Sequence, residues 1–422
     1  MRKVTWRLVP FLMACYFIAY LDRVNVAFAG PTMMQSLGLT AAAFGGAAGI
    51  FFIAYFFFEI PSNLALNRFG ARLWISRIMV TWGVISGAQA FVTGEVSLYV
   101  IRLLLGIAEA GFFPGIIFYM TLWFPAAYRA RIVGLFMFAI PVSTVIGSPI
   151  SGYILNLHGA LGLEGWQWIF LIEALPAIAM AVAVLFYLID KPTEAHWLTV
   201  EEKTWLQSRL DAEQRNREEH FKKDWFQSAF NMRVIALGLV YMAINIPQYG
   251  LSFFLPQIIK EFGVSDIEAG FITTLPYLVG GLGMIMWSMH SDRTGERVWH
   301  CVIPFIAMII GLSCAAIVDD LLLKMAVLCV AAWGFFSILP VFWTLPTSFL
   351  SGAGAAAGIA AVNSIGNLGG YFGPQIFGLL KTATQEDSAG LVFLAMVAAA
   401  GGLLVWMLGH NPELEKPRKS SD

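Results

Sequence analysis

The sequence predicts an all-α polytopic membrane protein, with twelve transmembrane helices arranged as two pseudo-symmetric six-helix bundles. Its 422 residues are 58% hydrophobic and only 13% charged, with a mean hydropathy of +0.72, which is too apolar for a set of soluble domains. The apolar runs are about twenty residues long, as a membrane-spanning helix requires, whereas a membrane barrel has alternating strands of roughly ten residues. Short motifs also recur at one offset in the two halves of the chain.

Polar, Gly-rich or Pro-rich stretches divide the chain into twelve apolar runs, at 8–30, 41–66, 73–92, 97–122, 132–156, 167–189, 234–258, 267–289, 300–318, 321–346, 354–380 and 389–409. The long polar interval 190–231 separates the first six from the last six. We therefore expect an N-terminal bundle at 1–190, a cytoplasmic linker at 191–231, and a C-terminal bundle with a cytoplasmic tail at 232–422.

The linker carries the signals of a surface helix. Thr199 and Glu202 have the spacing of a capping box, in which each side chain bonds the other's backbone N–H. An apolar stripe follows from Trp197, Leu198, Trp205, Leu206 and Leu210. We expect this helix to lie beneath the bundle.

Basic residues predict the orientation. Most flank the runs on the side of the N-terminus: Arg2, Lys3, Arg7, Arg68, Arg72, Arg77, Arg129, Arg131, Arg293, Arg297, Lys416, Arg418 and Lys419. Only Lys260, Lys324 and Lys381 lie opposite. The positive-inside rule then places both termini in the cytoplasm, with the protein in the cell (inner) membrane.

Two motifs indicate an internal duplication. Asn67, Arg68, Gly70 and Arg72 follow the second run, and Asp292, Arg293, Gly295 and Arg297 follow the eighth, 225 positions later. Pro149 and Pro374 are separated by the same offset. We expect the paired loop motifs to bond across the two halves and to control the conformational change. The alternative interpretation is that their arginines serve only the positive-inside rule.

Buried charge is confined to the first half, at Asp22, Arg23, Glu59, Arg102, Glu109 and Glu173. A charge inside the membrane is costly and usually lines a cavity, pairs or carries out a function. Arg23 shares a helix face with Tyr20, and a guanidinium binds a carboxylate bidentately, so Arg23 is the predicted anion anchor. Asp22 points about 100° away, toward a neighbouring helix.

Proton coupling is assigned to Asp22, Glu109 and Arg102. Glu109 and Arg102 lie seven residues apart on one face of the fourth run, where movement of the arginine would change the proton affinity of the acid. A fixed structural ion pair between spans is the alternative for these residues. Glu59 is interpreted as an interfacial acid.

The sequence resembles the major facilitator superfamily and, in finer features, its anion:cation symporter family. The resemblance covers essentially the whole chain and rests on Asp22 to Asn25, Glu59 to Asn63, Arg102 with Glu109, Trp123 to Pro125, Gly165 to Phe170, Pro192 to Leu198, and Asn363 to Gly370. It implies that Tyr55 binds substrate. Asn67 departs from the pattern, because the superfamily has Asp there.

The duplication predicts the opposite wall of the site. The residue 225 positions after Arg23 is Gln248, a neutral hydrogen-bond donor and acceptor, and Tyr249 follows it. Further neutral ligands of this wall are predicted at Trp343, Thr344, Asn363 and Asn367. Helix-to-helix hydrogen bonding is the alternative for the two asparagines.

The predicted function is proton-coupled import of a small organic anion by alternating access. Sugar acids, tartrate-like acids and aromatic carboxylates are the substrate classes that the resemblance implies. An uncoupled facilitator, a substrate sensor and an organic-phosphate antiporter are the alternatives. An enzyme is not expected, because all six histidines lie in loops or at helix ends. We expect a monomer in the lipid bilayer, with no cofactor, metal or nucleic acid.

Overall fold

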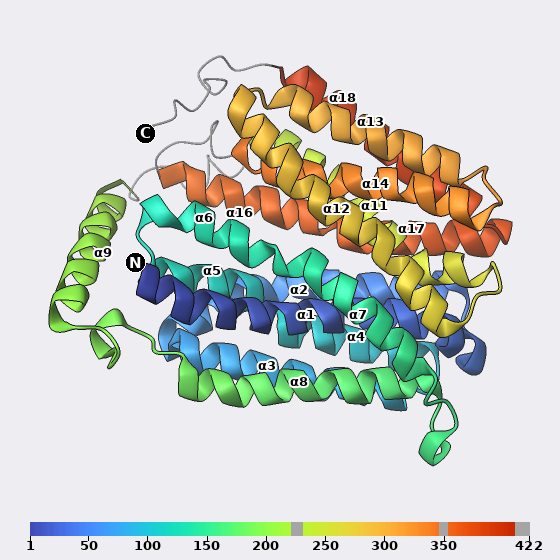
Figure 1. Ribbon diagram of the computed structural model, residues 1–422, viewed down its shortest axis with the longest axis horizontal. Helices are drawn as coiled ribbons and strands as arrows, with labels where there is room; N and C mark the ends of the chain where they lie inside the picture. Colours follow the sequence, from blue (N-terminus) through green and yellow to red (C-terminus); the bar gives the residue numbers. More distant parts are fainter. Residues whose placement is uncertain (221–230, 346–352, 410–422) are drawn as a thin grey trace.

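The computed structural model describes residues 1–220, 231–345 and 353–409, and these form helices and connecting loops (Figure 1). The first half contains α1 (Arg2–Leu37), α2 (Ala41–Phe69), α3 (Ala71–Ala88), α4 (Glu95–Glu109), α5 (Phe112–Trp123), α6 (Ala126–Met137), α7 (Ala139–Leu155) and α8 (Gly165–Tyr187). After α9 (Val200–His220), the second half contains α11 (Met232–Lys260), α12 (Asp266–Thr294), α13 (Val298–Ala315), α14 (Leu321–Phe342), α16 (Ala353–Asn367), α17 (Gly369–Thr384) and α18 (Ser388–Leu408). The predicted tail, with Lys416, Arg418 and Lys419, lies outside the described residues, as does 221–230 of the linker.

Ten helical segments of the described chain are long and apolar enough to cross a membrane. Two of them combine consecutive helices, α4 with α5 and α6 with α7, because the chain kinks inside the predicted fourth and fifth runs. The other two predicted runs also form helices of the bundle: α3 packs on α8, and α16 and α17 both pack on α11. The all-helical polytopic fold class is therefore confirmed.

The repeat is visible in the helix boundaries. Helix α2 covers positions 41 to 69 and α12 covers 266 to 294, so both of their ends differ by the predicted 225 residues. Each helix ends at a glycine with positive φ, 88° at Gly70 and 74° at Gly295, a conformation that glycine adopts without a steric penalty. The two loop motifs thus turn the chain at equivalent positions.

The two halves meet most closely at the end of the bundle opposite α9, which we call the far end (Figure 1). There, α2 packs on α17 and α7 packs on α12. A Cβ added to Gly45 would lie 2.2 Å from the Pro374 carbonyl oxygen, and one added to Gly378 would lie 2.2 Å from that of Ala41. Backbone-to-backbone packing of this kind, typical of small residues between membrane helices, closes the far end.

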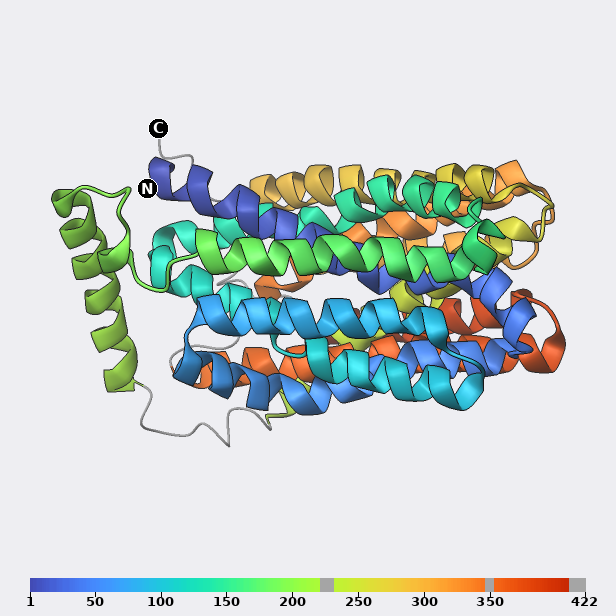
Figure 2. The same cartoon turned by 90° about the horizontal axis from the view of Figure 1, so that it is seen from below.

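Helix α9 crosses the other end of the bundle, beside the N-terminus (Figure 2). Its predicted capping box is present, since Thr199 N–H donates to Glu202 Oε2 at 2.9 Å and Glu202 N–H donates to Thr199 Oγ1 at 3.2 Å. Leu206 is buried, and the Trp197 ring stacks on Trp123 with centroids 5.6 Å apart. The linker thus contains a helix that begins with the cap its sequence predicts.

Candidate functional site

A cavity of about 80 Å³ lies between the two halves, and we call it the central cavity. Helices from both halves line it, through Tyr16, Tyr20, Arg23, Phe51, Phe52, Tyr55, Phe113, Met137, Ile140, Tyr241, Asn245, Gln248, Tyr249, Leu339, Asn363 and Asn367. Seven of the predicted substrate-binding residues are in this set: Tyr20, Arg23, Tyr55, Gln248, Tyr249, Asn363 and Asn367. The packing thus brings together residues that are more than 300 positions apart.

Arg23 of α1 is the charged side chain in this lining. Its guanidinium forms an ion pair with Glu109, and its side chain is 13% exposed. Aromatic rings surround the guanidinium carbon, with centroids at 5.8 Å for Tyr20, 5.5 Å for Phe51 and 5.8 Å for Tyr55. Its buried Nε has no hydrogen-bond acceptor. Arg23 therefore places a partly desolvated cation at the wall of the cavity.

Asp22 points away from the cavity toward α3, in the direction that helix geometry predicts. Trp82 Nε1 donates to Asp22 Oδ2 at 2.6 Å, and the Ser86 hydroxyl donates to Asp22 Oδ1. A third donor is Asn25 Nδ2, 3.0 Å from Asp22 Oδ1. With 1% of Asp22 exposed, these donors take the place of water around the carboxyl group.

Arg102 does not pair with Glu109, although the two residues lie on one helix. The fully buried Arg102 guanidinium donates instead to the carbonyl oxygens of Ala47 and Ala48 on α2, at 3.3 and 3.4 Å. Seven residues are about 10 Å of helix rise, which is too far for direct contact. Helix α4 also ends at Glu109, before a turn at Gly111 with a φ of 86°. Glu109 instead pairs with Arg23 of α1, which is an ion pair between spans, the alternative that we raised for Glu109.

The second half contributes neutral groups. Gln248 Oε1 is buried and accepts no hydrogen bond. The ring centroids of Tyr249 and of Phe52 in the first half are 4.6 Å apart. Asn245 Nδ2 donates to the Gly366 carbonyl oxygen at 2.9 Å, which joins α11 to α16. Sequence reasoning did not assign Tyr241 or Asn245 to the site. Their spacing of seven and three residues from Gln248 places all three on one helix face, and this signal could have identified them.

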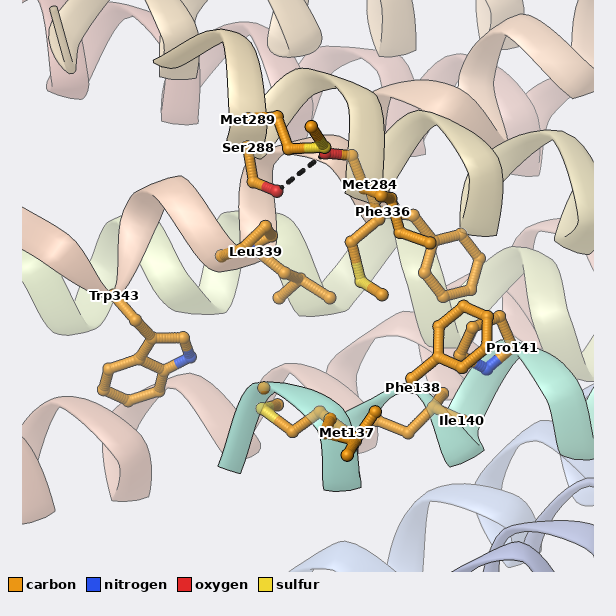
Figure 3. A pocket seen from close by; sticks show the side chains of 14 residues that line it. Met137, Phe138, Ile140, Pro141, Met284, Ser288, Met289, Phe336, Leu339 and Trp343 are labelled. Atoms are coloured by element: carbon orange, nitrogen blue, oxygen red, sulfur yellow. Dashed lines mark hydrogen bonds between the residues drawn. The ribbon is translucent and has the colours of Figure 1, made fainter. Parts of the chain in front are cut away.

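Two predicted residues lie outside the central cavity. Trp343 lines an adjoining cavity of about 430 Å³, between α6 and α7 on one side and α12 and α14 on the other (Figure 3). Thr344 Oγ1 donates to the Val341 carbonyl oxygen at 2.7 Å. The adjoining cavity is apolar, and its Ser288 hydroxyl donates to the Ile285 carbonyl oxygen at 3.0 Å. It meets the central cavity at shared residues: Met137, Ile140 and Leu339.

The loop motifs form their described bonds within each half rather than across the halves. The backbone N–H of Arg72 donates to Asp190 Oδ1 at 2.8 Å. In the second copy, Arg297 donates to Ser291 Oγ and to Asp292 Oδ1, both at 2.8 Å. Arg68 and Arg293 are exposed, and the side chain of Asn67 lies outside the described part of the chain. Cross-pairing of the motifs remains a prediction for another conformation.

Comparison with known proteins identifies close relatives. Residues 12–374 and 237–421 match the family model described as Major Facilitator Superfamily. An Agrobacterium vitis protein described as "Putative tartrate transporter" is 50% identical over 411 residues, covering 97% of this chain and 91% of that protein. "Inner membrane transport protein RhmT" of Escherichia coli strain K12 is 39% identical over 412 residues, covering 97% and 95%. A bacterial homologue of the human lysosomal transporter Spinster, solved in an inward-facing and occupied conformation, superposes with a TM-score of 0.78 at 17% identity, covering 98% of each chain.

Proposed function

Because the chain belongs to the major facilitator superfamily of membrane transporters, we propose that it is a proton-coupled symporter that imports a tartrate-like organic anion. The observation that carries this proposal is Arg23, the cation among the described residues that line the central cavity. A small dicarboxylate offers two anionic groups and hydroxyls. Arg23 binds one carboxylate, while Gln248, Tyr249, Asn363 and Asn367 provide neutral hydrogen bonds to the rest of the substrate.

Competition for Arg23 couples the proton to the anion. Without substrate, Glu109 neutralises the guanidinium. A substrate carboxylate that pairs with Arg23 leaves Glu109, 1% exposed, as a buried charge without its partner. Such a carboxylate takes up a proton, because burial disfavours the charged form. Anion and proton therefore enter together and leave together. Asp22, beside Arg23 on α1 but held by α3, is the second proposed proton site.

Alternating access follows from the arrangement of the halves. The far end is closed by the glycine contacts between α2 and α17, so we assign this conformation to the inward-facing state. The positive-inside rule makes the α9 end cytoplasmic and places both termini inside the cell. Bundles 1–190 and 232–422 rock about the central cavity, joined by the linker 191–231, in a monomer of the inner membrane.

Two alternatives predict different behaviour. An uncoupled facilitator or sensor needs Arg23 but not protonation of Glu109. An organic-phosphate antiporter needs more cationic charge for a doubly charged headgroup, and Arg23 is the cation among the described residues that line the central cavity. Because Arg23 is matched by neutral groups on the opposite wall, the cavity favours a carboxylate over a phosphate.

The test is uptake of radiolabelled L-tartrate into proteoliposomes with an acidic exterior. We expect accumulation above the external concentration, which collapses when an ionophore dissipates the proton gradient. Glycerol 3-phosphate and glucose serve as competitors, and neither is expected to inhibit uptake at concentrations at which unlabelled tartrate does. Equilibration without accumulation would identify the facilitator, and inhibition by glycerol 3-phosphate alone would identify the phosphate carrier.

A further inference from the structure

A second buried carboxyl group, outside the central cavity, lies close to Asp22. Glu173 of α8 is 2% exposed. Ser151 Oγ of α7 donates to Glu173 Oε1 at 2.7 Å, whereas Glu173 Oε2 has no hydrogen-bond partner. The Asn25 amide of α1 lies between the two acids: it donates to Asp22 and also interacts with Glu173. One network of side chains thus connects α1, α3, α7 and α8.

The charged groups around this network do not neutralise Asp22 and Glu173 if both are ionised. From the packed helices, Asp22 is the titratable group that acts on Glu173, while Ser151, Trp82 and Ser86 are neutral donors. The nearby cations are otherwise engaged, Arg23 with Glu109 and Arg102 with carbonyl oxygens of α2. Asp22 accepts three hydrogen bonds, whereas Glu173 accepts one, from Ser151. Of the two acids, Asp22 is the better stabilised as an anion.

We propose that Glu173 is a proton-binding site, which carries a proton at neutral pH in this conformation and, as a neutral acid, holds Asn25 against Asp22. The proton forms an O–H bond at the carboxyl group and comes from water. Glu173 acts through Asn25, so it is a positioning residue for Asp22. The inference depends on the proposed function only for the role of Asp22 in transport.

The hydrogen-bond inventory supports a proton at this position. The described atoms of the network that lack a partner are all buried acceptors: Glu173 Oε2, Asn25 Oδ1 and Oε1 of Gln89, whose Nε2 donates to Ser86 Oγ at 3.4 Å. Buried acceptors without donors cost free energy, and a carboxylate has only acceptors to offer. A protonated carboxyl group adds one donor to the network and removes one acceptor. It also removes the like charge beside Asp22.

Infrared difference spectroscopy of the purified full chain in lipid nanodiscs tests the inference without a transport assay. At neutral pH, the wild-type spectrum minus that of Glu173→Gln is expected to contain the C=O stretching band of a protonated carboxylic acid. The same band is expected to persist in Asp22→Asn. The proposal would be overturned if the wild-type minus Glu173→Gln spectrum lacked this band. It would also be overturned if the band disappeared in Asp22→Asn but not in Glu173→Gln. A failure of tartrate transport would not change either spectrum.

A serine pair supplies a matched control for the band. Ser151 bonds the Glu173 carboxyl group, whereas the equally buried Ser148, on the same helix, donates to the Thr144 carbonyl oxygen at 2.7 Å. Loss of a hydrogen bond to a C=O group raises its stretching frequency. Ser151→Ala is therefore expected to shift the band upward and Ser148→Ala to leave it in place. Equal effects of the two variants would contradict the assignment to Glu173.

Substitutions at Glu173 separate a retained proton from an exchanged one. Glutamine keeps the shape and the donor of the neutral acid, so Glu173→Gln should fold and transport about tenfold faster than Glu173→Ala, as expected when about 1.4 kcal/mol of positioning is lost. The pH profile of uptake should move in Glu173→Ala and in Asn25→Ala. Equal loss of uptake in Glu173→Gln and Glu173→Ala, at wild-type melting temperature, would show that a neutral side chain of this shape does not position Asn25 and would overturn the positioning role.

Discussion

The guanidinium of Arg23 and the carboxylate of Glu109, 86 positions apart in the chain, form an ion pair between α1 and α4 at the wall of the central cavity. The pair is formed in the first half alone, while the second half lines the same cavity with amides and aromatic rings. A substrate anion thus competes with a residue of the protein itself for Arg23.

Arg23→Lys should weaken tartrate binding by about tenfold or more, because an ammonium group cannot make the bidentate contact or replace the fork of N–H donors. Isothermal titration calorimetry in detergent measures the loss. Arg68→Lys is the matched control, since Arg68 is exposed at the end of α2 and lies outside the cavity. Equal tartrate affinity of Arg23→Lys and wild type would remove Arg23 as the anion anchor.

Glu109→Gln should retain tartrate binding but lose accumulation driven by a proton gradient. The neutral amide no longer competes for Arg23 and no longer exchanges a proton. The unpaired, partly buried guanidinium should lower the free energy of unfolding by about 3 kcal/mol in the absence of an anion. Melting curves with and without tartrate check the second effect, since ligand binding restores stability. Accumulation at the wild-type level would show that coupling does not pass through Glu109.

Gly45→Ala should open the far end, because its new Cβ would overlap the Pro374 carbonyl oxygen. Overpacking costs about 1 to 3 kcal/mol, which is enough for roughly a tenfold shift between conformations. The readout is the labelling rate of Ala41→Cys by a maleimide that cannot cross the membrane. Gly134→Ala is the control, since a Cβ there meets no atom within 4 Å. Identical labelling rates for the two glycine variants would contradict closure by these contacts.

Acidification should release the start of α9. The Thr199 N–H and the Lys3 ammonium, 3.1 Å from Glu202 Oε2, hold the pKa of Glu202 below its ordinary value. A depressed pKa means that the carboxylate stabilises the folded contact above the ordinary value and that the contribution disappears as the pH falls through the lowered one. Nitroxide mobility at Ser208→Cys should therefore rise only when the pH falls below the ordinary pKa of a glutamate side chain.

Two variants test the assignment of this pH effect to Glu202. In Glu202→Gln, the nitroxide should be mobile across the whole pH range, because the amide carries no charge for Lys3. Glu201→Gln removes the neighbouring acid and should behave like wild type. A wild-type label whose mobility does not depend on pH would show that this capping contact does not hold α9.

The large features of the fold were predictable because they depend on local patterns. Hydrophobic run length identifies the helices, the 225-residue offset predicts the matching ends of α2 and α12, and the Thr199–Glu202 spacing predicts the cap of α9. Seven predicted residues also line the central cavity. Buried charge pointed to Arg23 and its helix neighbour Tyr20, the repeat offset to Gln248 beside Tyr249, and the family resemblance to Tyr55.

The errors concern relationships that a single helix does not encode. The partner of Glu109 depends on the end of α4 and on the packing of α1, so its spacing from Arg102 was misleading. Trp343 faces the adjoining apolar cavity, which forms only where α14 meets the first half. Glu173 was recognised as a buried acid, but its relation to Asp22 requires Asn25 and Ser151 from two other helices.

The central claim is that a substrate carboxylate displaces Glu109 from Arg23 and causes Glu109 to take up a proton. The most direct test mixes tartrate with purified protein in a weakly buffered solution that contains a pH indicator. Wild-type protein is predicted to take up protons as tartrate binds, and Glu109→Gln is predicted to bind tartrate with a smaller proton uptake. Tartrate binding to the wild type with no proton uptake, or with the same uptake in both proteins, would contradict the account.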